Sequence, residues 1–100
     1  MAVLLQVEFK MDGPFGEEMA EQFADLAESI NKEEGFIRKI WTEKAENKEA
    51  GGIYIFDTQE NAEKYLEMHE ERLEEMGVPD LRARIFDINS KLTEITKGLV

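Results

Sequence analysis

The sequence predicts an α+β fold with the element order β-α-β-β-α-β, and both its apolar pattern and its length point to it. Four short segments alternate apolar and polar residues with the period of a strand, and two longer segments repeat them with the period of a helix. One strand segment, residues 53–56, is apolar throughout, so other parts of the protein must cover both of its faces. A length of 100 residues suits one domain, which we place at residues 1–100.

The first strand is expected at residues 2–9, where every second side chain is apolar. A turn cluster that contains glycine, proline and aspartate follows at residues 11–16. Apolar side chains then recur at three- and four-residue steps from Met19 to Ile30, with acidic residues between them. This spacing predicts one amphipathic helix that ends before Gly35.

A hairpin is expected next, at residues 36–56, and it contains Trp41, the only tryptophan of the chain. A polar connector at residues 44–48 joins its two strands. Gly51 and Gly52 stand at the start of the second strand of this hairpin. They indicate a bulge or a close approach between two backbones.

A second helix follows the hairpin. Asp57 or Thr58 is placed to cap its first turn, and Gly77 and Pro79 are placed to end it. The apolar stripe of this helix consists of Ala62, Tyr65, Leu66, His69, Leu73 and Met76. A fourth strand is expected at residues 81–88, and one or two further helical turns at residues 89–100.

This order of elements is that of the ferredoxin-like fold, whose four-stranded antiparallel sheet has the first and third strands at its centre. The two edge strands then carry basic side chains, which discourage unwanted pairing of an exposed edge. These side chains are Arg38, Lys39, Arg82 and Arg84. Two helices cover one face of such a sheet, and the apolar residues expected on the other face predict a homodimer that buries it.

Charge and composition exclude several classes of partner and site. A net charge of −11 argues against nucleic acid and against an anionic membrane surface as partners. The chain has one histidine, no cysteine and no glycine-rich phosphate-binding pattern, so we expect no bound metal and no cofactor. No segment approaches the roughly 20 apolar residues of a membrane span. The first residues lack the pattern of a signal peptide, so the expected location is cytoplasmic.

A series of short motifs runs through nearly the whole chain. They are Asp12-Gly13-Pro14-Phe15-Gly16, Met19-Ala20-Glu21-Gln22, the segments 26–31 and 49–54, Trp41-Thr42-Glu43, and Tyr65-Leu66-Glu67 with His69. Their order and spacing resemble the YdhR-like mono-oxygenase family. The resemblance implies a dimeric α/β barrel related to the antibiotic biosynthesis mono-oxygenases. It also implies a small aromatic, quinol or polyketide-like substrate that is oxidised without a cofactor.

A mono-oxygenase of this kind needs a dry pocket, a group that takes the substrate's proton and a donor for the developing oxyanion. The catalytic candidates are His69, Tyr65 and Trp41, because His69 titrates near neutrality and follows Tyr65 by one helical turn. The substrate-binding candidates are Tyr54, Phe56, Arg38 and Phe86. Each candidate also has a structural alternative, namely a half-buried side chain hydrogen-bonded to backbone for His69, core packing for the other rings and an edge-strand ion pair for the arginine. Glu70 and Arg72 are expected on the solvent side of the second helix.

Two other functions stay open at this point. A non-catalytic small-molecule-binding or stress-response module would use the same dimeric barrel. Haem degradation would use His69 as the iron ligand together with Gln6 on the first strand, but the second helix lacks the tryptophan of that pattern. Oxygen uptake in the presence of candidate phenols distinguishes an enzyme from a binding module.

Overall fold

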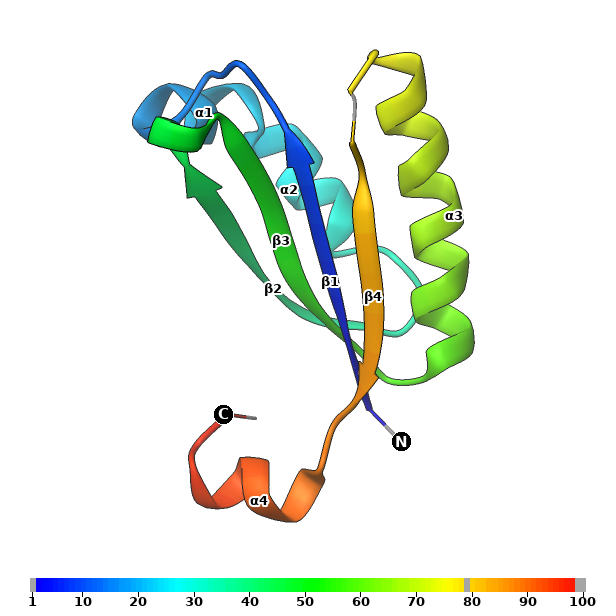
Figure 1. The fold of residues 1–100 in the computed structure, drawn as a ribbon. Coiled ribbons are helices and arrows are strands. Elements are labelled where there is room, and N and C mark those ends of the chain that lie inside the picture. The colour runs from blue at the N-terminus through cyan, green and yellow to red at the C-terminus, as the bar shows by residue number, and fades with distance from the viewer. Residues whose placement is uncertain (1, 79, 99–100) are drawn as a thin grey trace.

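The computed structural model describes residues 2–78 and 80–98. Its four strands form one antiparallel sheet in the order β2-β3-β1-β4 (Figure 1). The strands are β1 (Val3–Lys10), β2 (Phe36–Lys44), β3 (Glu49–Phe56) and β4 (Arg82–Asp87). The helices are α1 (Gly16–Gln22), α2 (Ala24–Ile30), the short η1 (Ala45–Asn47), α3 (Gln59–Glu75) and α4 (Ser90–Ile95). This is the predicted ferredoxin-like fold, with the first and third strands at the centre of the sheet.

The core lies between the sheet and the helices α1, α2 and α3, which all cover the same face (Figure 1). Alternate side chains of β1 and β3 point into it, and the largest fully buried ones include Leu5, Tyr54 and Phe56. The antiparallel register explains this, because Val3 lies opposite Phe56 and Leu5 lies opposite Tyr54. The two central strands therefore present one continuous apolar surface to the helices.

Helix α3 begins and ends as the sequence indicates. Of the two candidate caps it is Thr58 that accepts a hydrogen bond from the backbone N–H of Asn61, at 3.2 Å. At the other end Gly77 has a φ of 72°, and the N–H of Val78 donates to the carbonyl of Leu73. This is the Schellman arrangement that glycine favours. Pro79, also expected to end the helix, lies outside the described residues.

The predicted helix from Met19 to Ile30 is divided in two. At Phe23 the backbone leaves helical geometry, with φ −102° and ψ 8°, although its N–H still donates to the carbonyl of Met19. The ring of Phe23 packs against Trp41, with ring centroids 6.2 Å apart. Three- and four-residue spacing runs through the break, so the sequence pattern alone did not reveal it.

An irregularity of strand β2 decides which of its side chains face the core. Phe36 lies opposite Phe56, whereas Arg38 lies opposite Ile55, so one extra residue is inserted between them. A one-residue insertion moves every later side chain to the other face of the sheet. Lys39 consequently faces the helices, while Arg38 faces the open side.

The glycine pair of β3 reflects close approach rather than a bulge. A Cβ at Gly51 would overlap the carbonyl oxygen of Val7 on the neighbouring strand. A Cβ at Gly52 would lie 2.6 Å from Cε of Lys39 and 3.2 Å from Cε1 of Tyr54. Gly52 therefore leaves the space that the side chain of Lys39 occupies.

The face of the sheet away from the helices carries exposed apolar side chains. Ile37 and Ile40 of β2 are 52% and 57% exposed, and Phe86 of β4 is 37% exposed. Helix α4 extends beyond the end of the sheet (Figure 1) and exposes Leu92 and Ile95. We call these five residues the open-face patch. In the described part of the chain, no helix has the length and apolar character needed to cross a membrane.

Candidate functional site

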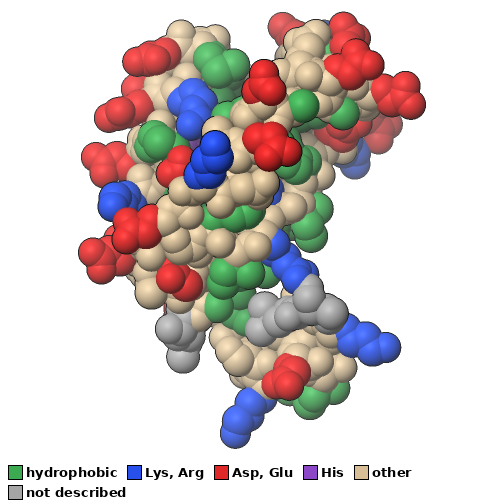
Figure 2. All heavy atoms as spheres, turned by 180° about the vertical axis from the view of Figure 1, so that it is seen from behind, with side chains coloured by type: hydrophobic (Ala, Val, Ile, Leu, Met, Phe, Trp, Pro, Cys, Tyr) green, Lys and Arg blue, Asp and Glu red, His purple; other side chains and the backbone are tan. Residues whose placement is uncertain are grey.

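A cavity of about 60 Å³ lies between helix α3 and the sheet, and its walls are largely apolar. On this side of the molecule acidic side chains gather over α3 and over α1 and α2 (Figure 2). The lining of the cavity contains no carboxylate from the described residues. Its ionisable side chains are Lys39, Tyr54, His69 and Arg72. The apolar lining comes from Phe9, Met11, Met19, Phe23, Leu26, Trp41, Gly51, Leu73, Met76 and Val78.

Four of the predicted site residues form one aromatic cluster at the inner side of this space. The hydroxyl of Tyr65 donates to the hydroxyl of Tyr54 at 3.3 Å, and the two rings have centroids 5.0 Å apart. The imidazole of His69 stacks on Tyr65, at 5.5 Å and an interplanar angle of 21°. Phe56 packs against Tyr65 at 5.4 Å. The i, i+4 spacing on α3 brings Tyr65 and His69 together, as the sequence predicted.

Trp41 joins the same cavity from strand β2, together with a lysine that the sequence reading assigned to a solvated edge. The ammonium of Lys39 lies 3.3 Å from the centroid of the Trp41 ring and 4.5 Å from that of Tyr54. These are cation–π distances. The bulge of β2 accounts for the difference, because it turns Lys39 inward.

Arg72 also lines the cavity, which corrects the expectation that it lies on the solvent side of its helix. It follows His69 by three residues, so both side chains project from the same face of α3. Within the described residues, two buried nitrogens lack any hydrogen-bond partner, namely Nδ1 of His69 and Nη1 of Arg72. The alternative of a histidine satisfied by backbone is therefore not what the structure shows at Nδ1. Buried polar atoms without partners are rare in folded proteins.

The electrostatics of the cavity favour uncharged side chains when it is empty. Burial, with the nearby Arg72, lowers the pKa of Lys39 from 10.5 to about 7. Burial, with Lys39 and Arg72, lowers the pKa of His69 from 6.5 to about 4. Burial also raises the pKa of Tyr54 and of Tyr65, so both hydroxyls keep their protons. Among the described residues, no carboxylate forms an ion pair with Lys39, His69 or Arg72.

The cavity adjoins a wider hollow of about 600 Å³ that is open to solvent. The two share Met11, Phe23, Met76 and Val78 in their linings. Methionine side chains are unbranched and adaptable, so this boundary is able to widen around a ligand. A second apolar hollow, of about 310 Å³, meets the cavity at Met19, Phe23 and Trp41.

Arg38 and Phe86 do not line the interior cavity, although Arg38 shares a separate hollow at the edge of the sheet with Trp41. Both lie on the open face, where Arg38 is opposite Ile55 and Phe86 is opposite Leu4. The ring of Phe86 lies under the guanidinium of Arg84, at 4.7 Å. Strand alternation explains the position of Phe86, and the bulge explains that of Arg38.

Gln6 likewise faces the open side of the sheet, where it lies opposite Ile53 and donates to Glu8 at 3.0 Å. His69 lies on the covered side. The two residues considered for haem degradation are therefore on opposite faces of the sheet within one chain. In residues 2–78 and 80–98 there is no group of three or more histidine, cysteine, aspartate or glutamate side chains able to hold a metal ion.

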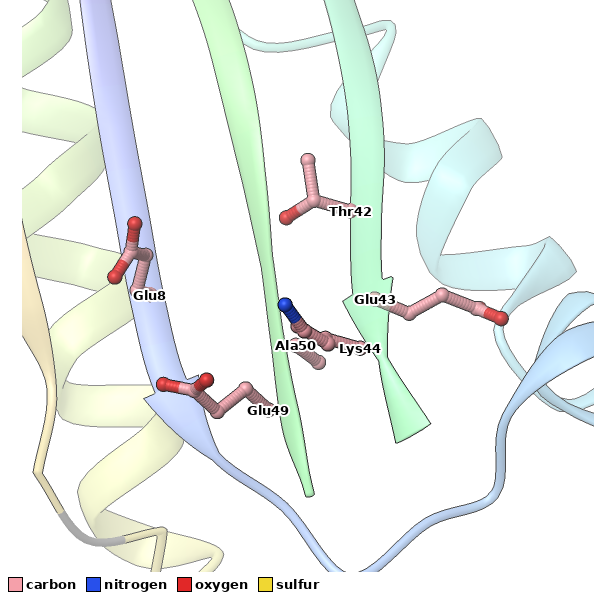
Figure 3. Close-up of a pocket in the computed structure, with 6 residues that line it drawn as sticks. All are labelled: Glu8, Thr42, Glu43, Lys44, Glu49 and Ala50. Carbon is pink, nitrogen blue, oxygen red and sulfur yellow. The ribbon is translucent and has the colours of Figure 1, made fainter. Parts of the chain in front are cut away.

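A separate hollow of about 210 Å³ lies on the open face, and Figure 3 shows its lining. Its side chains include Glu8, Thr42, Lys44 and Glu49, while Glu43 points away and accepts a hydrogen bond from the N–H of Gly16. This hollow is polar and lacks the aromatic walls of the interior cavity.

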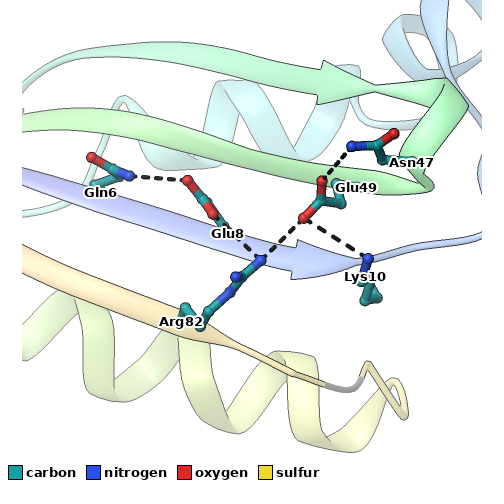
Figure 4. A network of polar contacts seen from close by, with 6 residues as sticks. All are labelled: Gln6, Glu8, Lys10, Asn47, Glu49 and Arg82. Carbon is teal, nitrogen blue, oxygen red and sulfur yellow. Dashed lines mark hydrogen bonds and ion pairs between the residues drawn. The ribbon is translucent and has the colours of Figure 1, made fainter.

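Arg82, one of the basic side chains of the edge strands, is already paired beside this hollow. Its guanidinium lies 3.0 Å from a carboxylate oxygen of Glu49 and 3.4 Å from one of Glu8 (Figure 4). Glu49 also accepts a hydrogen bond from Asn47 and lies 4.0 Å from Lys10. Neighbouring strands thus neutralise their own charges here, and exposed pairs of this kind add little stability.

Comparison with known proteins gives a family match and a likeness of fold. The family model described as "Putative mono-oxygenase ydhR" matches residues 4–99. A solved structure from Deinococcus radiodurans, described as a putative antibiotic biosynthesis monooxygenase, is similar in fold with a TM-score of 0.58. The alignment covers 89% of this chain and 93% of that chain at 13% sequence identity. No curated protein matches the sequence.

Proposed function

The chain belongs to the YdhR family of mono-oxygenase-like proteins, and from this membership we propose that it is a cofactor-independent mono-oxygenase. Its proposed substrate is a small aromatic, quinol or polyketide-like compound that binds in the cavity between α3 and the sheet. The observation that carries the proposal is the buried imidazole of His69, whose Nδ1 has no partner in a largely apolar cavity that Lys39, Tyr54 and Arg72 also line. Perturbed ionisable groups gathered in one cavity are typical of functional sites.

The substrate of such a reaction supplies its own electrons. A phenol or enol loses a proton, and its electron-rich anion passes electrons to dioxygen. One oxygen atom enters the product as a carbonyl group, and the other leaves as water with two hydrogens from the substrate, which supplies all four electrons. The protein has to bind and orient the substrate, move the proton and exclude bulk water.

The cavity residues divide these tasks by their chemistry. Trp41 offers a flat face for a planar substrate. The neutral imidazole of His69 is free to form a hydrogen bond with the substrate's hydroxyl through Nδ1. The hydroxyl of Tyr54 accepts a hydrogen bond from Tyr65, keeps its own proton and serves as the donor toward developing oxyanion charge. These assignments make His69 and Trp41 the proposed catalytic residues, with Tyr65 acting through Tyr54.

The test is incorporation of labelled oxygen. Quinols and hydroxylated polycyclic phenols are incubated with the protein under ¹⁸O₂, and the product is examined by mass spectrometry. We expect one ¹⁸O atom per product molecule, at a rate that His69→Ala lowers by about 10² to 10³, the range found when one hydrogen bond to a developing oxyanion is removed. Because quinols also react with oxygen unaided, the control is the same mixture with heat-unfolded protein. Tight binding without label incorporation would assign the non-catalytic binding module instead.

We also propose that two copies of the chain pair through the open face of the sheet. The open-face patch consists of apolar side chains exposed on the two edge strands β2 and β4 and on α4 beyond the end of the sheet, and no described helix of the same chain covers the open face. The exposed Leu92 and Ile95 of α4 are suited to pack on Ile37 and Ile40 of a second copy. An apolar patch built from several elements is a common mark of an interface.

The assembly is tested by sedimentation at micromolar concentration. We expect a dimer for the native chain and a monomer for Ile40→Glu, because the charge would be buried without a partner. Ile40→Thr is the matched control, since it keeps the β-branched shape without a charge. A native chain that sediments as a monomer would contradict the proposal.

A further inference from the structure

We propose that the cavity between α3 and the sheet binds its ligand as a planar oxyanion, a phenolate or a carboxylate, held by Lys39 and Arg72. Where the ligand is a phenol, Lys39 takes its proton: the O–H bond breaks, a new N–H bond forms on the amine, and the phenolate faces the resulting ammonium. The proposal takes the location of its site from the function proposed above. It adds the class of the ligand and two residues outside the predicted catalytic set.

The cavity holds buried polar nitrogens that lack hydrogen-bond partners. His69 is 5% exposed and its Nδ1 has no partner, and Nη1 of Arg72 is buried without one. The ammonium of Lys39 lies over the faces of Trp41 and Tyr54. Burying such groups without acceptors is unfavourable. An oxyanion bound among them would provide the missing acceptor.

The fold of the backbone brings the side chain of Lys39 into the cavity. The bulge of β2 turns the side chain toward the helices, and Gly52 leaves the room that the side chain fills. Without the bulge Lys39 would lie on the open face, in water. Two independent backbone features thus place an ammonium in an apolar space, where a partly buried lysine is readily tuned as a base.

The described side chains that line the cavity around Lys39 include basic groups and no carboxylate. Helix α3 contributes His69 and Arg72, and β3 contributes Tyr54. Strand β1 and the helices α1 and α2 contribute only the apolar side chains Phe9, Met19, Phe23 and Leu26 to this cavity. Glu28 of α2 lines a neighbouring hollow with Lys39 but forms no ion pair with it. The protein supplies positive charge here and leaves the negative charge to a ligand.

Between the two proton carriers of the cavity, Lys39 is the better base. Its pKa of about 7 leaves a large share of neutral amine near neutral pH, and its conjugate acid is still accessible. His69, with a pKa of about 4, is neutral but binds a proton poorly. His69 therefore suits orientation of the ligand's oxygen, and Lys39 suits removal of its proton.

The dimensions favour a ligand with one anionic end and an apolar body. The cavity volume of about 60 Å³ is small, so the cavity itself takes the oxyanion and only part of a ring. The rest of the ligand would extend past Met11 and Met76 into the adjoining hollow. Phe23 and Trp41 provide walls for the ring.

The test uses benzoate, its neutral counterpart benzamide, and 4-nitrophenol as probes. Binding of the first two is measured by calorimetry and by the fluorescence of Trp41, which is the only tryptophan. We expect benzoate to bind about tenfold or more tightly than benzamide, because a charged hydrogen bond is worth more than a neutral one. Lys39→Met should remove that preference. Lys32→Met, an exposed lysine after α2, is the matched control and should keep it.

The phenol is followed through the visible absorbance of its anion. The native protein should lower the pKa of bound 4-nitrophenol, and Lys39→Met should not. A preference for benzoate alone identifies carboxylates as the ligands, and a lowered phenol pKa identifies phenols. Equal binding of benzoate and benzamide with an unshifted phenol pKa would overturn the proposal. Binding is measured without turnover, so anion preference without ¹⁸O incorporation keeps this inference and refutes the mono-oxygenase.

Discussion

Replacing Lys39 by methionine should make the protein more stable, and the effect should depend on pH in a defined direction. In the folded protein the pKa of Lys39 is about 7, against an ordinary value of 10.5. The unfolded chain therefore binds more protons at this position between those two pH values. As far as Lys39 is concerned, the free energy of unfolding is highest above pH 10.5. It falls as the pH is lowered toward 7 and changes no further below pH 7.

The size of this change in the free energy of unfolding follows from the difference between the pKa values of Lys39 in the folded and the unfolded chain. A difference of this size corresponds to roughly 5 kcal/mol in total, of which roughly 2 kcal/mol lies between pH 7 and pH 9. Lys39 is only partly buried, so screening by solvent reduces the effect and both energies are upper limits. A gain of about 2 kcal/mol would raise the melting temperature of a domain of this size by roughly 10 °C. That is a large share of the stability of a small domain.

The assay is urea unfolding followed by circular dichroism at pH 7, 8 and 9, at one fixed protein concentration. We expect the free energy of unfolding of the native chain to rise with pH. Lys39→Met should be more stable than the native chain at pH 7 by up to a few kcal/mol and should lose the rise. Lys32→Met should follow the native chain. A flat native profile, or a destabilised Lys39→Met, would refute the reasoning.

Three further changes probe the neighbours of Lys39. His69→Gln should remove the part of acid destabilisation that falls between pH 6.5 and pH 4, where the histidine is protonated in the unfolded chain but must release that proton on folding, because its pKa in the folded protein is about 4; acid unfolding curves of both proteins check this. Tyr54→Phe removes the 3.3 Å hydroxyl pair and should lower the free energy of unfolding by about 1 kcal/mol in urea. Gly52→Ala should displace Lys39 and weaken benzoate binding while the circular dichroism spectrum keeps its shape; unchanged calorimetric affinity would contradict the steric argument.

Much of the fold was predictable because apolar residues repeat along each strand and helix with the period of that element. The alternation of residues 2–9 and the uninterrupted apolar run of residues 53–56 indicated the two central strands, and the sheet order confirms both. The three- and four-residue spacing of α3 brought Tyr65 and His69 to one face. Such patterns are visible because burial repeats along an element. The division of the first helix at Phe23 has no such signature.

The composition of the cavity was predictable only in part. Tyr54, Phe56, Tyr65, His69 and Trp41 lie together on the covered side of the sheet. Arg72 also had a readable signal, because it follows His69 by three residues on the same helix. Lys39 had none, since a one-residue bulge leaves no periodic trace in a short strand. The same bulge placed Arg38, a predicted substrate ligand, on the opposite face.

The proton on the amine of Lys39 affects both the stability of the empty protein and its affinity for an anion. An anion beside Lys39 would raise the pKa of its ammonium, so ligand binding above pH 7 must be accompanied by uptake of a proton. The affinity for a carboxylate should therefore fall as the pH rises from 7 to 9, over the range in which the empty protein becomes more stable. The opposite slopes have one cause. Folding without a ligand favours the neutral amine, whereas binding an oxyanion favours the ammonium, as expected where a binding site is maintained at some expense of stability.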